Sequence, residues 1–176
     1  MAEIRPFRGL RYQPGLVGDL ARVIAPPYDA ISPDEQRALH ARSPYNVVRL
    51  EYGEAHNHDH EQNNRYTRAA AALAQWLASA VLMHDDSPAF YLYDQEFEHD
   101  GAHYRRRALL ARVGLAEWAT GTVRPHEHTL AQPKEDRLRL LRACRANVSP
   151  LFALYRDPRG VIRGALDDAV GGRSPA

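Results

Sequence analysis

The sequence has very little cysteine and no long apolar run, and each shortage excludes a class of protein. Cys144 is the only cysteine among the 176 residues, so no disulfide can form within the chain. A single cysteine is typical of a reducing compartment. No run of about 18 apolar residues has the pattern of a membrane-spanning helix, and the start lacks a charged and then apolar leader. We therefore expect a cytoplasmic protein without a membrane partner.

Charge of one sign is also scarce, because the formal net charge is only +1. The charges are nevertheless uneven along the chain. Residues 51–100 hold ten acidic residues against two arginines, whereas residues 101–150 hold ten basic residues against four acidic ones. The second half could therefore face an anion, but proteins that bind duplexes are usually basic overall. Since no helix-turn-helix pattern with a basic recognition helix occurs either, nucleic acid is not the expected partner.

The composition is that of a folded domain with a core, since 44% of the residues are apolar and 26% are charged. The patterns along the chain predict an α+β fold. We expect a mixed sheet with an antiparallel hairpin over residues 88–113, flanked by three main helices. Residues 1–156 are expected to form a single domain, and residues 157–176 either the start of a second region or a frayed tail.

Three stretches have the spacing of helices. The first covers residues 33–42, because Ser32 can cap it, Pro33 suits its first position and Glu35 completes a capping box. The second begins near residue 66 and has one apolar face, formed by Ala69, Ala72, Leu73, Trp76, Leu77 and Ala80. The third starts at Pro133 and runs to about Ala146. Its packed side should carry Arg137, Leu138, Leu141 and Cys144, with Arg139 and Arg142 facing away.

Strand patterns occur near residues 4–12, in VVRLEY at residues 47–52, and in the hairpin. The hairpin is the clearest local signal, because Asp100 and Gly101 suit a two-residue turn. That turn predicts four directly opposite pairs: Glu96 with Arg105, Asp94 with Arg107, Phe97 with Tyr104, and Tyr93 with Ala108. Two of the three consecutive arginines thus have carboxylates opposite them. We interpret them as part of the sheet and not as a nucleic-acid patch.

Histidines recur at every second residue in the stretch EAHNHDHEQNN, at His56, His58 and His60. This spacing could hold a metal ion only if the segment were an extended strand. The stretch lacks apolar alternation and is acidic and rich in asparagine. We therefore favour a solvated loop over a metal site.

The stretch RPHEHTLAQPKEDR, residues 124–137, gathers the groups of a candidate anion site. His126, Glu127 and His128 come just before the expected start of a helix, and Lys134 lies in its first turn. The amide groups at a helix N-terminus together with a lysine favour a bound anion. A carboxylate and an imidazole beside bound phosphate could transfer a proton to or from a hydroxyl group.

A structural explanation of the same stretch stays open. His-Glu-His does not have the spacing of the helical His-Glu-x-x-His metal motif, so we assign no metal site there. Asp136 and Arg137 are adjacent and could simply neutralise each other or cap neighbouring loops.

Several long segments resemble a known bacterial and archaeal family. They are IAPPYDAIS, SPYNVVRLEYG, YTRAAAALAQWLASAVL, YLYDQEF and RPHEHTLAQPKEDRLRLLRACRANVSPLFALY. In this order they resemble the family labelled domain of unknown function 1015, from about Ile4 to Tyr155. The resemblance covers nearly the whole chain.

The later half of such family members carries an Asp-Gly-His-His-Arg segment similar to one in ParB-like and sulfiredoxin-like nucleotide-binding proteins, including archaeal free-serine kinases. By this resemblance the family would be a nucleotide-dependent phosphotransferase acting on a small hydroxylated metabolite such as serine, with ATP or ADP and Mg²⁺ as cofactors. Glu127 would be the base, His126 its neighbour and Asp29 the second choice. Phosphate or substrate would meet Arg124, His128, Lys134, Arg137 and Asn147.

The Asp-Gly-His-His-Arg segment is absent from this sequence. Members of the family are usually about twice as long, so the chain resembles their N-terminal half: a truncated product, half of a split gene or a deliberately shortened piece. Two hypotheses follow. One is a part of a phosphotransferase site completed by a second domain or chain. The other is a non-catalytic binding or scaffold module, and exposed faces would favour self-association in either.

Overall fold

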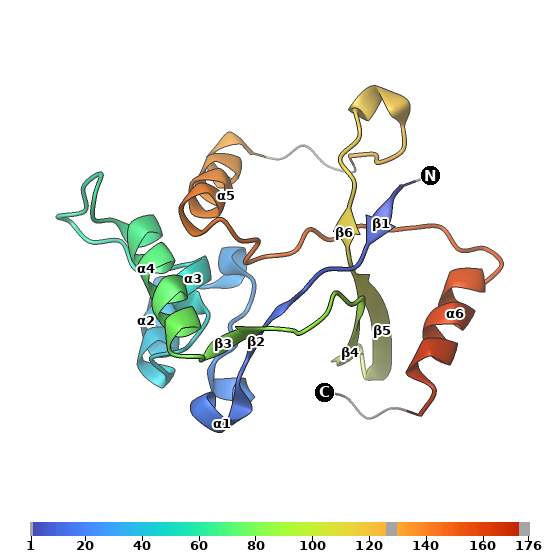
Figure 1. The fold of residues 1–176 in the computed structure, drawn as a ribbon, viewed down its shortest axis with the longest axis horizontal. Coiled ribbons are helices and arrows are strands. Elements are labelled where there is room, and N and C mark those ends of the chain that lie inside the picture. The colour runs from blue at the N-terminus through green and yellow to red at the C-terminus, as the bar shows by residue number, and fades with distance from the viewer. Residues whose placement is uncertain (1, 126–129, 173–176) are drawn as a thin grey trace.

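The computed structural model describes residues 2–125 and 130–172 and has an α+β fold, as predicted (Figure 1). A group of helices lies on one side of the molecule, small strands occupy the middle, and one helix lies alone on the other side. The helices are α1 (Pro14–Val17), α2 (Pro33–Arg42), α3 (Val48–Glu51), α4 (Arg65–Ala78), α5 (Ala131–Cys144) and α6 (Val161–Val170). None of these helices is long and apolar enough to cross a lipid bilayer.

The described strands form three separate two-stranded antiparallel sheets, which corrects the expected mixed sheet. The pairs are β1 (Ile4–Arg5) with β6 (Arg112–Val113), β2 (Leu10–Tyr12) with β3 (Leu82–His84), and β4 (Tyr91–His99) with β5 (Ala102–Leu110). The first stretch is divided because Pro6 has no amide hydrogen to donate to a ladder. At Gly9 the backbone amide donates to the Tyr91 hydroxyl at 2.7 Å instead.

The β4–β5 hairpin has the predicted register at all four pairs. Asp100 and Gly101 have φ values of 49° and 75°, the left-handed backbone that a tight two-residue hairpin turn requires. Arg107 contacts Asp94 at 2.7 Å, and Arg105 contacts the same carboxylate at 2.5 Å. Arg105 therefore pairs with the diagonal neighbour Asp94 and not with Glu96 directly opposite.

The core lies among the helices and beneath β3. One buried cluster consists of Leu50, Leu73, Trp76, Val81 and Leu82, and a second of Ile31, Leu39 and Val48. Helix α2 has the predicted bounds, and the Ser32 hydroxyl accepts a hydrogen bond from the Glu35 amide. The predicted face of α4 is confirmed at Ala69, Leu73 and Trp76. Leu77 is 38% exposed, and Ala80 lies beyond the end of the helix.

The predicted strand at residues 47–52 is wrong, because this segment forms the short helix α3. The fully buried side chain of Asn46 explains the difference. Its amide group donates to the carbonyls of Arg22 and Ile24, and its oxygen accepts from the Val48 amide at 3.0 Å. These bonds turn the chain and direct Val48 and Leu50 into the two core clusters. Tertiary contacts thus override the strand preference of this sequence.

Helix α5 begins two residues before the predicted start, so that Pro133 lies in its first turn. Leu140 is its buried residue, whereas Leu138 and Leu141 are 38% and 43% exposed. The predicted stripe was therefore wrong at both leucines, because the packed side follows the spacing of Pro133, Arg137, Leu140 and Cys144. After α5 an extended connector leads to α6. The division of the chain at residue 156 stays a prediction.

Candidate functional site

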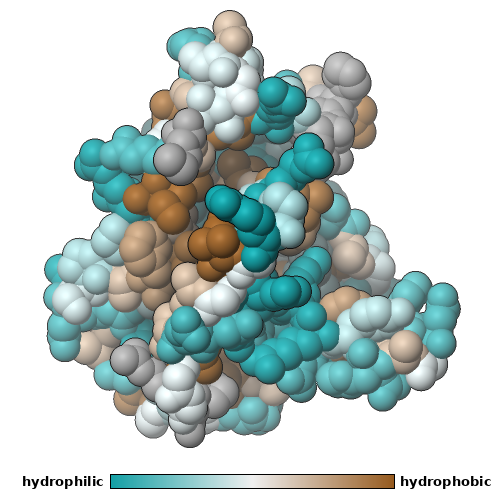
Figure 2. Space-filling view, turned by 90° about the vertical axis from the view of Figure 1, so that its right-hand side faces the viewer, coloured by the Kyte–Doolittle hydropathy of each residue, from teal (hydrophilic) through white to brown (hydrophobic). Residues whose placement is uncertain are grey.

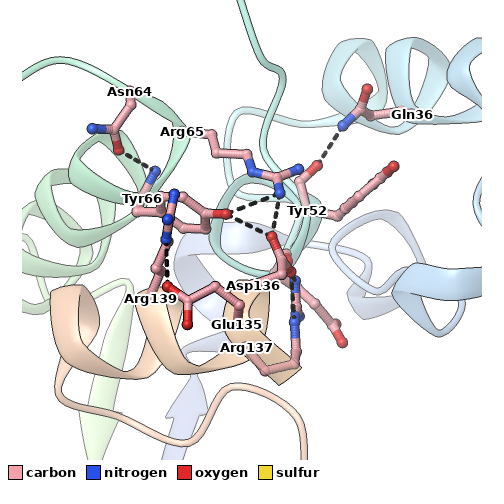
Figure 3. Close-up of polar contacts among 10 residues, drawn as sticks. Gln36, Tyr52, Asn64, Arg65, Tyr66, Glu135, Asp136, Arg137 and Arg139 are labelled. Atoms are coloured by element: carbon pink, nitrogen blue, oxygen red, sulfur yellow. Dashed lines mark hydrogen bonds and ion pairs between the residues drawn. The ribbon is translucent and has the colours of Figure 1, made fainter. Parts of the chain in front are cut away.

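Helix α5 packs against α4 and places Asp136 at the centre of a polar network (Figure 3). The Tyr66 hydroxyl donates to Asp136 Oδ1 at 2.7 Å, and Arg65 makes an ion pair with the same oxygen. On the other side, Arg137 Nε donates to Asp136 Oδ2 at 2.9 Å. We call Asp136, Arg65, Tyr66, Arg137 and the neighbouring Tyr28 and Tyr52 the Asp136 cluster. Its carboxylate thus joins the start of α4 to the second turn of α5.

The Arg137 side chain extends the cluster to two further segments. Its guanidinium carbon lies 3.9 Å from the centroid of the Tyr28 ring, a cation–π contact with the connector before α2. Its Nη2 also donates to the Glu51 carbonyl at 3.0 Å, at the end of α3. The Glu51 carboxylate in turn accepts a hydrogen bond from the Ser149 hydroxyl. The cluster therefore ties the two sides of α5 to α3, α4 and the connector.

Tyrosine rings surround the second arginine of the cluster. The Arg65 guanidinium carbon lies 5.0 Å from the Tyr66 ring centroid and 5.8 Å from that of Tyr52. The Tyr52 carbonyl accepts a hydrogen bond from the Gln36 side chain at 2.7 Å, which links the cluster to α2. The rings and the single carboxylate offset part of the cost of keeping two guanidinium groups half-buried.

Electrostatics keep Asp136 ionised. Burial alone would raise the pKa of the Asp136 carboxyl, but hydrogen bonds from Arg137 and Tyr66 and the charge of Arg65 outweigh it and hold the pKa below its usual range. A carboxylate with a lowered pKa is a poor proton acceptor at neutral pH. Asp136 thus serves as the centre of an ion network and not as a base.

The predicted site residues that the structure describes divide into two groups. Arg137 is half-buried and engaged in the Asp136 cluster, so Asp136 and Arg137 do neutralise each other. Lys134 is exposed in the first turn of α5, and Asn147 is exposed just beyond its end. The contact of Tyr28 with Arg137 brings the exposed residue Asp29 to the same side of α5. Their proposed roles stay predictions.

The remaining predicted residues lie toward or beyond the edge of the described chain. Arg124 is exposed, and its Nε donates weakly to the Gly121 carbonyl at 3.3 Å. His126, Glu127 and His128, which include the predicted base, lie outside the described residues. The described site therefore does not include these three residues.

Sequence reasoning missed Arg65, Tyr66, Tyr28 and Tyr52 as members of the Asp136 cluster. Arg65 and Tyr66 are separated from Asp136 by 71 and 70 residues, so no local spacing connects them. A signal existed only in the recognised segments, because four of the five contribute at least one residue to the cluster. Tyr28 comes from IAPPYDAIS, Tyr52 from SPYNVVRLEYG and Asp136 from the segment that begins at Arg124.

The meeting of these segments agrees with the comparison with protein families. The family model described as "Protein of unknown function (DUF1015)" matches residues 4–176. The chain belongs to this family. The match confirms the resemblance found in the sequence and extends it past Tyr155 through α6. No curated protein and no solved structure matches this DUF1015 chain.

The histidine loop of the DUF1015 chain is exposed at His56, His58 and His60, as expected of a solvated loop. The rings of His56 and His58 stack with centroids 5.5 Å apart. Asp59 turns back and contacts Arg68 of α4 at 2.7 Å. Within residues 2–125 and 130–172, no three histidine, cysteine or acidic side chains are grouped so that they could hold a metal ion.

A hollow of about 460 Å³ lies between the hairpin and α6. It is lined by Arg105, Arg107, Tyr155, Asp157, Gly160, Arg163, Leu166 and Asp167. Arg107 is already paired with both Asp94 and Asp167, and Asp157 accepts from two amides at the start of α6. Because these charges largely cancel, we expect the hollow to bind anions only weakly.

Proposed function

We propose that this chain is a non-catalytic protein-binding module whose apolar surface is completed by another polypeptide. The observation that carries the proposal is the size of its surface. The accessible area is 13,740 Å², whereas a compact chain of 19.9 kDa would expose roughly 8,700 Å². An excess of more than half is typical of a chain that folds against a partner.

Among the described residues, more than half of the large exposed apolar side chains lie in one part of the sequence, from β6 to the first turn of α6. The most exposed are Leu115 at 104%, Leu151 at 98% and Leu154 at 84%. The others in this part are Val113, Trp118, Leu130, Leu138, Leu141, Phe152, Tyr155, Val161 and Ile162. Figure 2, seen from the side where α6 lies in Figure 1, shows apolar side chains gathered around a hollow in the middle of this face. Contiguous apolar patches of this kind mark interaction sites.

The Asp136 cluster supports the same proposal. The guanidinium group of Arg137 is engaged by a carboxylate, a carbonyl and an aromatic ring. An arginine with these contacts anchors α5, and its remaining Nη1, which has no hydrogen-bond partner in the described chain, is buried out of reach of a phosphate in solution. The cluster thus holds the helix from which the apolar connector emerges.

The test is the binding of the dye 8-anilinonaphthalene-1-sulfonate, which becomes fluorescent on accessible apolar surface. We expect strong fluorescence from the folded chain. The double variant Leu151→Ser/Leu154→Ser should reduce the signal, and the matched variant Leu16→Ser, at 55% exposure in α1, should change it little. Fluorescence no higher than that of a compact control protein of this size would contradict the proposal.

A second candidate function is the nucleotide-dependent phosphotransferase acting on a small hydroxylated metabolite, with ATP or ADP and Mg²⁺. One observation favours it: among the described residues no side chain caps the N-terminus of the 14-residue helix α5, and the exposed Lys134 lies in its first turn. Such an end favours an anion. In this proposal Lys134, Arg124 and Asn147 bind phosphate or substrate, Arg137 positions α5, and Glu127, His126 or Asp29 accepts the proton.

Calorimetric titration with ATP, ADP and phosphoserine tests the second candidate, beside Lys134→Ala and Glu127→Ala. Lys134 is the only lysine of the chain, so protection of its amine from acetylation is an independent measure of binding. Saturable binding that Lys134→Ala weakens, together with protection of the amine, would support an anion site at α5. Binding that is unchanged in Lys134→Ala would place any anion elsewhere.

A further inference from the structure

Residues 151–155, with the sequence LFALY, form an uninterrupted apolar segment that belongs to no helix or strand. Leu151, Phe152, Leu154 and Tyr155 are 98%, 56%, 84% and 55% exposed. No backbone hydrogen bond joins the segment to another described residue. A short run of consecutive apolar residues between prolines, here Pro150 and Pro158, is typical of a strand that is covered on both faces. The segment therefore has the sequence of a strand without a strand's partners.

The β4–β5 hairpin, in turn, lacks a neighbouring strand among the described residues. In the described chain it is a sheet of only two strands, so one edge of β5 lacks a partner along its nine residues. An unpaired edge presents amide and carbonyl groups that can accept a further strand. A two-stranded sheet is also only marginally stable without additional cover.

The apolar segment already lies beside β5. The Arg106 guanidinium carbon is 5.0 Å from the centroid of the Phe152 ring, and Tyr155 lines the hollow together with Arg105 and Arg107. Successive side chains of a strand point to opposite faces, so Arg106 is on one face of β5 and its two neighbours are on the other. Phe152 and Tyr155 are three residues apart and also point to opposite faces if the segment is extended. Side chains of the two segments thus lie on the same two faces, although no backbone hydrogen bond joins the segments.

We infer that residues 151–155 of one chain add as a strand to the β5 edge of a second copy of the same chain. This inference rests on the proposed protein-binding function and names its partner. Each chain carries both the edge and the segment, so two copies exchange them in two identical contacts and form a closed dimer. The contacts cover the exposed leucines and give the hairpin a third strand.

The low net charge of the chain and the size of its exposed surface favour a second copy of the chain as the partner of the β5 edge. The net charge of +1 opposes self-association only weakly. Direct pairing of β5 with β5 would place arginines opposite arginines, which is destabilising, whereas the apolar segment brings no charge. A stable dimer buries about 800 Å² on each partner. The excess surface of this chain is several times larger than that.

Sedimentation equilibrium over a concentration series tests the dimer. We expect the unmodified chain to dimerise and Leu154→Asp to raise the dimer dissociation constant by at least about tenfold, because the substitution affects both contacts. Leu154 is 84% exposed, so the monomer should fold normally. Leu16→Asp, on exposed α1, is the matched control and should dimerise like the unmodified chain.

A paramagnetic label locates the contact. One sample of the chain carries a nitroxide at Leu154→Cys in a Cys144→Ala background. It is mixed with a second sample that is labelled with ¹⁵N and carries no nitroxide. Broadening of amide signals in Ala102–Leu110 of the ¹⁵N chain would support exchange, since it arises only between copies. A dimer without broadening in β5, or a dimer that Leu154→Asp leaves unchanged, would overturn the inference.

The dye measurement separates the inference from the proposed function. A monomer that binds the dye strongly would overturn the second copy as partner while the protein-binding proposal stands. A monomer that does not bind the dye would overturn both.

Discussion

The helical side of the molecule and the hairpin side differ in how far their apolar residues are buried. Around α4 and α5, the core side chains of Leu73 and Trp76 are buried, and the charge of Asp136 is paired within the chain. Around β5 and the connector to α6, arginines are also paired, but Leu151 and Leu154 face solvent. From this difference we expect the helical side to be stable by itself, and we place the proposed binding surface on the hairpin side.

The largest expected effect is a break in the helical side. Trp76 is 3% exposed and contacts Tyr12 and Tyr45 with ring centroids about 6 Å apart. Trp76→Ala should lower the free energy of unfolding by about 3–5 kcal/mol, because it leaves a cavity in the core. Urea unfolding measures this. Leu77→Ala, one residue on and 38% exposed, should cost much less, and equal losses would mean that α4 does not pack as described.

A smaller break removes the charge at the centre of the Asp136 cluster. Asp136→Asn leaves the guanidinium groups of Arg65 and Arg137 half-buried beside a neutral amide. We expect a loss of about 2 kcal/mol, below the value for fully buried ion pairs because both arginines keep some contact with water. Glu135→Gln, which removes an exposed pair with Arg139, is the control and should cost about 0.5 kcal/mol. Equal costs in urea unfolding would show that the cluster does not anchor α5.

The stability that the Asp136 carboxylate contributes to the helical side should depend on pH. The folded-state pKa of Asp136 is lowered from 3.8, so its stabilising contribution is present above that pH and is lost as the pH falls through the folded pKa. The difference in unfolding free energy between the unmodified chain and Asp136→Asn should therefore shrink steadily below about pH 4. Urea unfolding at pH 7, 5, 4 and 3 measures it. A difference that is independent of pH would indicate that the Asp136 charge does not matter.

The smallest effect is expected in the hairpin turn. Gly101 has a φ of 75° and open space where a Cβ would be, so Gly101→Ala should cost about 1 kcal/mol through backbone strain alone. The loss should appear as faster amide exchange in β4 and β5, with α4 unaffected. Gly15→Ala, in α1 and also without neighbours within 4 Å, is the matched control. Faster exchange in α4 as well would mean that the two sides unfold together.

Local patterns predicted the hairpin register, the bounds of α2 and the buried face of α4, because turn residues, caps and apolar periodicity act over a few residues. They failed at residues 47–52, where the buried Asn46 imposes a helix, and at Leu138 and Leu141, which lie beside the packed stripe of α5. For the candidate site, the pairing of Asp136 with Arg137 could be predicted from adjacency. Arg65 and Tyr28 could not, since they come from distant parts of the chain.

The sequence by itself determined the family, the α+β class and the hairpin, because these depend on ordered segments and on contacts between near neighbours. Only the tertiary structure decided that Arg137 is an anchor engaged by Asp136 and that residues 151–155 lie exposed beside an open strand edge. Both depend on which distant surfaces meet. The packing of the whole chain sets those contacts, and no local pattern encodes them.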